Sequence, residues 1–301
     1  MYYYRLYGFR VVSDLSFPQL VTETEAMPDA PVISIQSGTV PEWIAQITEK
    51  QYEFGEEFGW LSNKTTWLMV EDGRKITYCL KEGGNLMYLR TYILGYGMSM
   101  LAMQRGILSI HCSALCDEDG AVLIAGESGA GKSTVTTAFL ERGYHLMADD
   151  MALVETVDGV TRAFPAFPFQ KLCRNVAVEK GYELEKLIYI NEEKDKFLVP
   201  YEGEFGLTAV PVKAFIMLGL AQGEEVVTQE IEGLGRFHIY ANNLFLRHLL
   251  GQDKYKPAIG QRCLEMAAKV PTYYIGRPKG KDTTKQVIEE TFRLAKNEYH
   301  K

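Results

Sequence analysis

Short runs of alternating apolar and polar residues, separated by turn residues, fill the first third of the chain. Such alternation is typical of strands that bury one face. It predicts strands at 3–12, 32–37 and 75–81, and a hairpin over 51–70. Residues 85–104 instead repeat apolar side chains every three or four positions, which predicts a helix with one buried face.

From residue 106 onward the pattern changes to strand, loop, helix and strand. Strands are predicted at 107–114, 121–125 and 144–148, with a helix at 134–142 that ends at Gly143. A strand at 214–220 and a helical stretch at 242–250 complete the expected core. We therefore expect a β-rich N-terminal domain with a closing helix over 1–105, and an α/β domain over 106–301.

Charge and composition narrow the class of protein. The chain has a net charge of −7 and no basic run, which argues against a nucleic-acid partner because phosphate backbones are held by clustered Lys and Arg. The five cysteines are an odd number and mostly far apart, which favours reduced thiols over a disulfide framework or a zinc site. The N-terminus lacks a signal-peptide pattern and no segment is apolar enough to span a bilayer. We expect a cytoplasmic protein without a membrane partner.

A glycine-rich loop joins the strand at 121–125 to the helix that follows. Its residues are Gly126, Glu127, Ser128, Gly129, Ala130, Gly131, Lys132 and Ser133, with Thr134 next. Glycines permit backbone angles that turn consecutive N–H groups around a polyphosphate, and the positive end of the following helix points at the same anion. In such a P-loop the lysine bridges the outer phosphates and the serine is a ligand of magnesium. The pattern predicts ATP and Mg²⁺ binding at 126–134.

Two carboxylates end the strand that follows the helix. Asp149 and Asp150 lie where we expect the ligand-binding edge of a parallel sheet. Phosphoryl transfer needs one carboxylate in the magnesium shell and another that accepts the proton of the acceptor hydroxyl. His111 ends the strand before the P-loop strand. A lone histidine there is commonly a core residue, but it can also orient an aspartate or contact a phosphate.

Three segments together carry a family resemblance. The run from Ile107 to Leu115, the run from Ala121 to Thr134, and the run from Arg142 to Asp150 resemble the catalytic core of HPr kinase/phosphorylase, whose P-loop fold is shared with ATP-dependent phosphoenolpyruvate carboxykinase. The segment from Tyr4 to Leu20 resembles the start of HPr-kinase-related proteins of bacterial gene clusters. The resemblance implies an α/β P-loop core of this type behind a small N-terminal β-rich domain.

The same resemblance implies roles for single residues. His111 assists the site together with Lys132, Asp149 acts as the base, and Asp150 joins Ser133 at magnesium. The glycine-rich signature that serves the reverse, phosphorolytic reaction in the best-known member is replaced here by an aromatic and proline-rich segment at 163–175. Lys171 and Arg174, near the end of that segment, can reach a phosphate or an acidic substrate, but a solvated position is the favoured interpretation for both and for Lys196.

These observations predict a serine-kinase-like phosphotransferase. Its acceptor is a hydroxyl, best assigned to a serine, on a peptide, a protein or a small molecule. Two alternatives stay open: a nucleotide-binding regulator without turnover, and a carboxykinase-like phosphoryl-transfer enzyme. The sequence does not decide the nucleotide base or the oligomeric state, with a homo-oligomer among the options.

Overall fold

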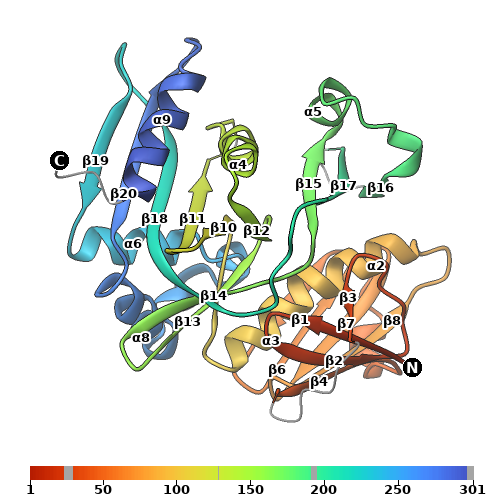
Figure 1. Cartoon of the computed structure of the whole chain (residues 1–301). Helices are drawn as coiled ribbons and strands as arrows, with labels where there is room; N and C mark the ends of the chain where they lie inside the picture. The colour runs from red at the N-terminus through yellow and green to blue at the C-terminus, as the bar shows by residue number, and fades with distance from the viewer. Residues whose placement is uncertain (24–29, 128, 191–194, 297–301) are drawn as a thin grey trace.

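The computed structural model describes residues 1–23, 30–127, 129–190 and 195–296, which form a mixed α/β architecture with several sheets (Figure 1). Among these residues no helix combines the length and the apolar character needed to cross a membrane.

The N-terminal third of the chain folds into one twisted sheet with the strand order β3-β1-β2-β4-β8-β7-β6-β5. Its strands are β1 (Tyr2–Leu6), β2 (Phe9–Ser13), β3 (Val21–Thr22), β4 (Val32–Ser37), β5 (Gln51–Phe54), β6 (Phe58–Ser62), β7 (Thr66–Glu71) and β8 (Lys75–Leu80). The short helix α1 (Glu42–Ala45) lies between β4 and β5. The strand predicted at 32–37 is confirmed.

Two predictions in this region gave the wrong number of strands. The single strand expected at 3–12 is a hairpin, because Tyr7 and Gly8 both have positive φ, 53° and 75°, and reverse the chain between β1 and β2. Consecutive positive φ values match the turns that suit the right-handed twist of hairpins. The hairpin expected at 51–70 is the three-stranded meander β5-β6-β7.

The helix expected at 85–104 is present but is not uniform. It consists of α2 (Leu86–Tyr92), a π-helical turn η1 (Ile93–Gly97) and α3 (Met98–Gln104). Asn85 caps it, since its side-chain oxygen accepts hydrogen bonds from the backbone N–H groups of Met87 and Tyr88. Leu89, Ile93 and Leu101 face the N-terminal sheet and are fully buried. Figure 1 shows α2 and α3 lying across this sheet.

The remaining chain builds a larger, mixed sheet in which β12-β10-β11-β18-β14-β13-β9 are neighbours and β20 joins β18 and β19. Its strands are β9 (Leu108–Ile110), β10 (Ser113–Asp117), β11 (Gly120–Gly126), β12 (His145–Ala148), β13 (Ala152–Val157), β14 (Val160–Phe164), β18 (Val210–Ala221), β19 (Val227–Ile231) and β20 (Thr272–Pro278). Our expectation of a parallel sheet is wrong. The tight turn between Asp117 and Gly120 forces β10 and β11 to be antiparallel, and among the described strands of this sheet only the pairs β11/β18 and β18/β20 are parallel.

Helices pack on both sides of this sheet. Helices α4 (Lys132–Glu141) and α9 (Thr284–Ala295) contact each other and the strands β10, β11, β18 and β20. The Phe139 and Phe292 rings stack between them with centroids 3.9 Å apart. Helix α8 (Pro257–Ala267) contacts β9 and β13 and supports α6 (Leu234–Asn242). The stretch predicted as helical at 242–250 is the end of α6 followed by a turn, and then α7 (Arg247–Leu250) and η3 (Gly251–Tyr255).

A small third sheet, β15-β17-β16, stands apart from the other two (Figure 1). It consists of β15 (Phe169–Cys173), β16 (Ile188–Ile190) and β17 (Lys196–Pro200), with α5 (Arg174–Glu179) and η2 (Leu184–Lys186) between the first two strands. This small sheet forms a lobe together with α5 and η2. Strand β16 contacts α2, so the lobe lies against the N-terminal helix, by which we mean the continuous stretch α2–η1–α3.

The hydrophobic core crosses the proposed domain boundary. One buried cluster contains Val11, Leu89 and Met100 on the N-terminal side together with Ile110 and Leu244 beyond it. The chain itself passes the boundary in a turn at Arg105 and Gly106, where Gly106 has a φ of 74°. The division into 1–105 and 106–301 remains a prediction.

A buried hydrogen bond across this shared core has a testable effect on stability. The Tyr7 hydroxyl donates to the carbonyl oxygen of Met151 over 2.9 Å, and Tyr7 is 4% exposed. We expect Tyr7→Phe to lower the free energy of unfolding by about 1–2 kcal/mol, because the buried carbonyl loses its donor. Urea unfolding measures the change. Tyr3→Phe, at an exposed position of the preceding strand β1, is the control, and equal effects of both variants contradict the prediction.

Candidate active site

The glycine loop connects the end of β11 to the start of α4. Gly129 and Gly131 have φ of 84° and 102°, in the left-handed region that favours glycine. Gly126 is needed for space, because a Cβ there would lie 3.0 Å from Cβ of Leu218 on β18. No side chain caps the N-terminus of α4, which leaves its first-turn N–H groups available to an anion. The loop therefore has the geometry of an anion cradle.

The residues predicted to bind the nucleotide differ in their exposure to solvent. Glu127, Gly129, Ser133 and Thr134 are exposed and Lys132 is half-buried. Ala130 is buried in the cluster around Phe139, so its side chain anchors the loop. Ser128 lies outside the described residues.

The strand order brings the aspartate pair to the same edge as the loop. Strands β11 and β12 are both antiparallel to β10, which lies between them, so they end at one edge of the sheet. Two interstrand spacings separate their ends, about 10 Å. Ser113 begins β10 at this edge. Gly126, Ser113 and Asp149 are thus brought together by a mixed sheet.

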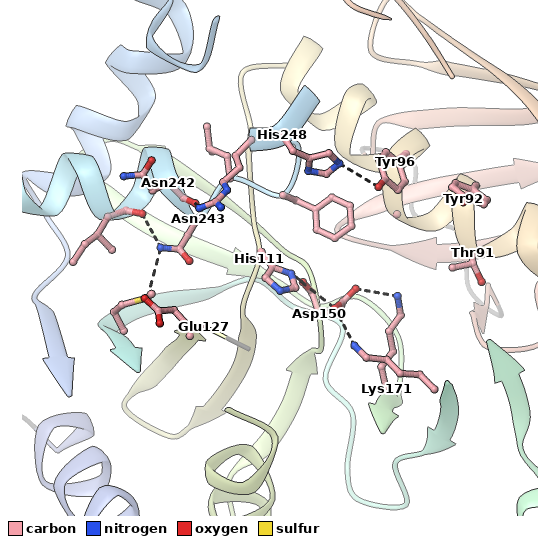
Figure 2. A pocket seen from close by; sticks show the side chains of 18 of the residues that line it. Thr91, Tyr92, Tyr96, His111, Glu127, Asp150, Lys171, Asn242, Asn243 and His248 are labelled. Carbon is pink, nitrogen blue, oxygen red and sulfur yellow. Dashed lines mark hydrogen bonds and ion pairs between the residues drawn. The ribbon is translucent and has the colours of Figure 1, made fainter. Parts of the chain in front are cut away.

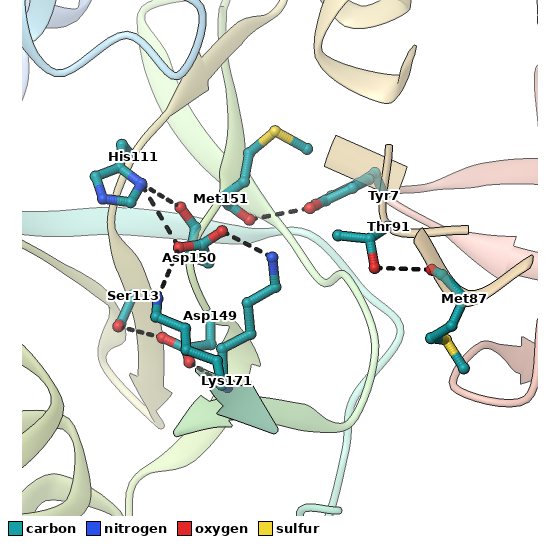
Figure 3. Close-up of polar contacts among 10 residues, drawn as sticks. Tyr7, Met87, Thr91, His111, Ser113, Asp149, Asp150, Met151 and Lys171 are labelled. Carbon is teal, nitrogen blue, oxygen red and sulfur yellow. Dashed lines mark hydrogen bonds and ion pairs between the residues drawn. The ribbon is translucent and has the colours of Figure 1, made fainter. Parts of the chain in front are cut away.

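Asp149 is held by two donors. The Ser113 hydroxyl donates to one of its carboxylate oxygens over 2.6 Å, and the backbone N–H of Lys171 donates to the other over 2.8 Å (Figure 3). A carboxylate oxygen can accept a further hydrogen bond or a metal ion. The carboxylate is therefore oriented but still able to react.

Asp150 lies among cations. Its carboxylate accepts a hydrogen bond from Nζ of Lys171 over 2.9 Å, and Nζ of Lys196 lies 3.9 Å from its other oxygen. Its side chain is 14% exposed and that of Lys171 is 13% exposed. Burial opposes ionisation of the carboxyl, but the positive charges of Lys171, Lys196 and Lys132, with His111, outweigh it and hold its pKa well below the usual range. Asp150 remains an anion at all physiological pH values.

His111 faces the same aspartate. Its Nδ1 lies 2.8 Å from the backbone oxygen of Asp150, and since a carbonyl oxygen only accepts, Nδ1 carries the proton and Nε2 is an acceptor. Burial and the charge of Lys132 lower the pKa of His111 to about 4, against the opposing effect of Asp150. The imidazole is therefore neutral at pH 7. This contact also supports the left-handed φ of 72° at Asp150.

Sequence reasoning misjudged two lysines. Lys171 on β15 and Lys196 on β17 were expected in solvent, yet their side chains are only 13% and 19% exposed. Cys173 on β15 is the cross-strand partner of Lys196 on β17, so their side chains point to the same face of the small sheet. Lys171 lies two residues before Cys173 on β15, and its side chain therefore points to that face as well. Only the pairing of β15 with β17 reveals this shared face, because the residues around each lysine do not indicate burial. Arg174 is exposed as expected and pairs with Asp195 over 2.6 Å.

Two further residues of the loop's surroundings escaped the sequence analysis. Arg277, at the end of β20, donates a hydrogen bond to the carbonyl oxygen of Gly129 over 2.6 Å. Its Nε is buried without a hydrogen-bond partner. Tyr274 on the same strand lines the cavity beside Glu127. Strand β20 lies far along the chain from the motif, so only the parallel pairing with β18 reveals this neighbourhood.

One cavity of about 1120 Å³ opens onto this edge of the sheet (Figure 2). His111, Gly126, Glu127, Asp150, Lys171 and Lys196 line one side of it. The volume exceeds that of pockets for a single drug-sized ligand, about 300–1,000 Å³. Two substrates can therefore occupy it together.

Magnesium suits the oxygen donors at this edge. It prefers hydroxyl, carboxylate, phosphate and water oxygens and keeps several waters. The exposed Ser133 hydroxyl and the Asp149 and Asp150 carboxylates supply such oxygens. Within the described residues no three or more His, Cys, Asp or Glu side chains cluster as a metal site. The oxygen donors at this edge are therefore of the kind that suits magnesium.

The coupling between Lys132 and His111 can be measured. Lys132→Met should raise the pKa of His111 from about 4 toward 6.5, because the loss of a positive charge makes protonation easier. Histidine side-chain NMR titration in magnesium-free buffer measures it, with the exposed Lys64→Met as control. An unchanged His111 pKa in Lys132→Met would mean that the lysine and the histidine do not share a site.

Comparisons with known proteins give a structural likeness only. No protein family profile and no curated protein matches the sequence. One solved structure that resembles the chain is that of the Hpr(Ser) kinase/phosphatase from Coxiella burnetii. It is 15% identical, with a TM-score of 0.33, and the match covers 63% of this chain and 96% of that one.

Proposed function

We propose that the protein is an ATP-dependent kinase of the HPr-kinase type, which transfers the γ-phosphoryl group to a hydroxyl of a peptide, protein or small molecule. The observation that carries the proposal is that Gly126 and Glu127 of the glycine loop line one cavity together with Asp150 and His111, while α4 begins at the end of the same loop. Lys132 lies near enough to His111 and Asp150 to shift the pKa of both. These are the groups that phosphoryl transfer requires.

The nucleotide binds, in this proposal, with its phosphates in the glycine loop. The first-turn N–H groups of α4 and the Lys132 ammonium hold the β- and γ-phosphates, and the positive helix end adds to the attraction. Arg277 fixes the loop through Gly129. When bound, magnesium supplies positive charge at the same phosphates, held by Ser133 and Asp150.

Asp149 is the proposed base. Surrounding cations depress the pKa of Asp150 and make its carboxylate a poor proton acceptor. Asp149, which accepts hydrogen bonds from a hydroxyl and a backbone N–H, is the other carboxylate at this edge. The acceptor hydroxyl gives its proton to Asp149 while its oxygen bonds to the γ-phosphorus, and the bond from that phosphorus to the bridging oxygen breaks to release ADP. Asp150 and not Asp149 lines the cavity, so an exchange of the two roles is the main rival within this mechanism.

The nucleotide proposal predicts a loss of binding. Lys132→Ala should weaken ATP–magnesium affinity by about 10- to 100-fold, because charge-assisted hydrogen bonds to the phosphates are lost. Calorimetry measures it, with the exposed Lys64→Ala as control. Unchanged affinity and unchanged product formation in Lys132→Ala would overturn the proposal. ATP binding with no phosphoryl transfer to any acceptor would instead indicate a nucleotide-binding regulator.

The proposed division between the aspartates predicts different kinetic effects. Asp149→Asn should lower kcat about 10²- to 10⁴-fold at saturating magnesium, since a proton acceptor is lost. Asp150→Asn should mainly raise the magnesium concentration needed for half-maximal rate. Magnesium titrations of initial rate separate the two effects. The reversed pattern would assign the base to Asp150, and equal effects on metal affinity would contradict any division.

A further inference from the structure

The cavity has a second wall that comes from outside the sheet edge. This aromatic wall consists of Tyr92, Tyr96, Phe245 and His248, with Gly95 between the two tyrosines. Tyr92 ends α2, Gly95 and Tyr96 belong to η1, and Phe245 and His248 lie in or just before α7. Figure 2 shows Tyr96 and His248 pointing toward each other, and the Tyr96 hydroxyl lies 3.3 Å from Nε2 of His248.

The rings of the wall contact one another in a series that reaches the proposed active site. Tyr96 lies 5.6 Å from Tyr92 and 5.9 Å from both Phe245 and His248, measured between ring centroids. Phe245 in turn lies 6.1 Å from His111. Tyr96 sits in a π-helical turn, and such turns occur frequently at functional sites because they redirect side chains. The wall is therefore a continuous surface from the N-terminal helix to the histidine.

Cations surround this surface. Nζ of Lys50 donates to the Tyr96 hydroxyl over 3.3 Å and lies 5.2 Å from its ring centroid. Arg247 is exposed beside it. Both charges help to lower the pKa of His248, after burial as the main cause. The described lining contains four cationic side chains, Lys50, Lys171, Lys196 and Arg247, and two acidic ones, Glu127 and Asp150.

The charge of the cavity lining has the opposite sign to the net charge of the whole protein. The chain carries −7, yet this cavity is lined by more cations than anions among the described residues. One of the two acidic residues, Asp150, already pairs with Lys171. A positive cleft with low-dielectric walls concentrates anionic ligands. The nucleotide accounts for the end near Lys132, but Lys50 and Arg247 lie at the aromatic wall.

From this arrangement we propose that the aromatic wall is the acceptor subsite and that the acceptor is an acidic peptide segment. Its carboxylates lie toward Lys50 and Arg247, its backbone and apolar groups lie against Tyr96 and Phe245, and its serine hydroxyl reaches the aspartates. A peptide suits a cavity that spans both parts of the chain. The inference rests on the proposed kinase function, and it assigns the N-terminal helix a direct part in substrate choice.

Direct binding tests the charge preference without requiring turnover. Fluorescently labelled peptides with one serine, flanked by either Asp and Glu or Lys and Arg, are titrated with the full chain plus magnesium and a nonhydrolysable ATP analogue. Anisotropy should show the acidic peptide binding at least about tenfold more tightly, with the difference shrinking as salt screens the charges. Equal binding, tighter binding of the basic peptide, or no binding of either overturns the acidic-acceptor proposal.

Charge reversal locates the subsite. Lys50→Glu and Arg247→Glu should each weaken the acidic peptide by about fivefold, in keeping with about 1 kcal/mol for an exposed charge pair. Lys64→Glu makes the same charge change on the N-terminal sheet outside the cavity and should leave peptide affinity unchanged. Tyr96→Phe keeps the ring and should retain most of the affinity, whereas Tyr96→Ala should lose it. Equal weakening by all three charge reversals would point to bulk charge and overturn the location.

ATP affinity distinguishes failure of this inference from failure of the kinase proposal. Lys50→Glu and Arg247→Glu should leave the calorimetric affinity for ATP–magnesium unchanged, because both residues lie at the aromatic wall. If the wild type binds ATP but shows no preference for the acidic peptide, the acceptor inference fails and the kinase proposal stands. If the wild type binds no ATP, the kinase proposal fails first.

Discussion

The carboxylate of Asp150 is the contact on which the arrangement of the site depends. The carboxylate joins the end of β12 to the small sheet through Lys171 and Lys196. The backbone oxygen of the same residue accepts a hydrogen bond from the His111 ring and fixes its orientation. Burying the Asp150 carboxylate without these cations would cost folding free energy, because an unpaired charge would lose its hydration. The same cost would apply to the Lys171 ammonium if the carboxylate were absent. Four segments distant in the sequence are thus held at one point. A left-handed φ at Asp150 directs the chain so that both aspartates face this edge.

The electrostatics of this cluster have a direction in pH. The folded-state pKa of Asp150 is depressed, so its ion pairs contribute stability above about pH 4 and lose it as the pH falls toward that lower value. His111 also has a lowered pKa, and the unfolded chain therefore binds its proton first as the pH falls below about 6.5. Protonation of either group at acidic pH therefore lowers the free energy of unfolding. At neutral pH the histidine is uncharged and the cluster keeps the positive character that anions require.

The N-terminal part of the chain and the sheet edge that carries the aspartates are not independent. They share one hydrophobic cluster, and the buried Tyr7 hydroxyl donates to the backbone oxygen of Met151, the residue after Asp150. Residues of α2 and η1 line the same cavity as Asp150. The π-helical turn η1 sits at this junction, with its buried side on the sheet and its exposed side on the cavity. A helix that only closed a small domain would need no such turn. This placement is the physical basis for assigning it to substrate recognition.

The sequence by itself determined the local elements and the chemistry of the motif. Glycines at 126, 129 and 131 require a loop between a strand and a helix because of their backbone freedom, and the structure has that loop between β11 and α4. Alternation likewise predicted β4, and three- and four-residue spacing predicted the helix at 85–104. Such signals are local, since strand and helix periodicity depends on neighbouring residues alone.

Only the tertiary structure decided the rest, because it depends on which distant segments become neighbours. The turn at Tyr7 and Gly8 split one expected strand, and the tight turn before Gly120 made the sheet mixed. Burial of Lys171 and Lys196 follows from the lobe packing over Asp150, which neither lysine's own sequence surroundings specify. The same holds for Arg277 at the glycine loop. Charge and exposure of a side chain are properties of the packed neighbourhood, and the sequence pattern does not contain that neighbourhood.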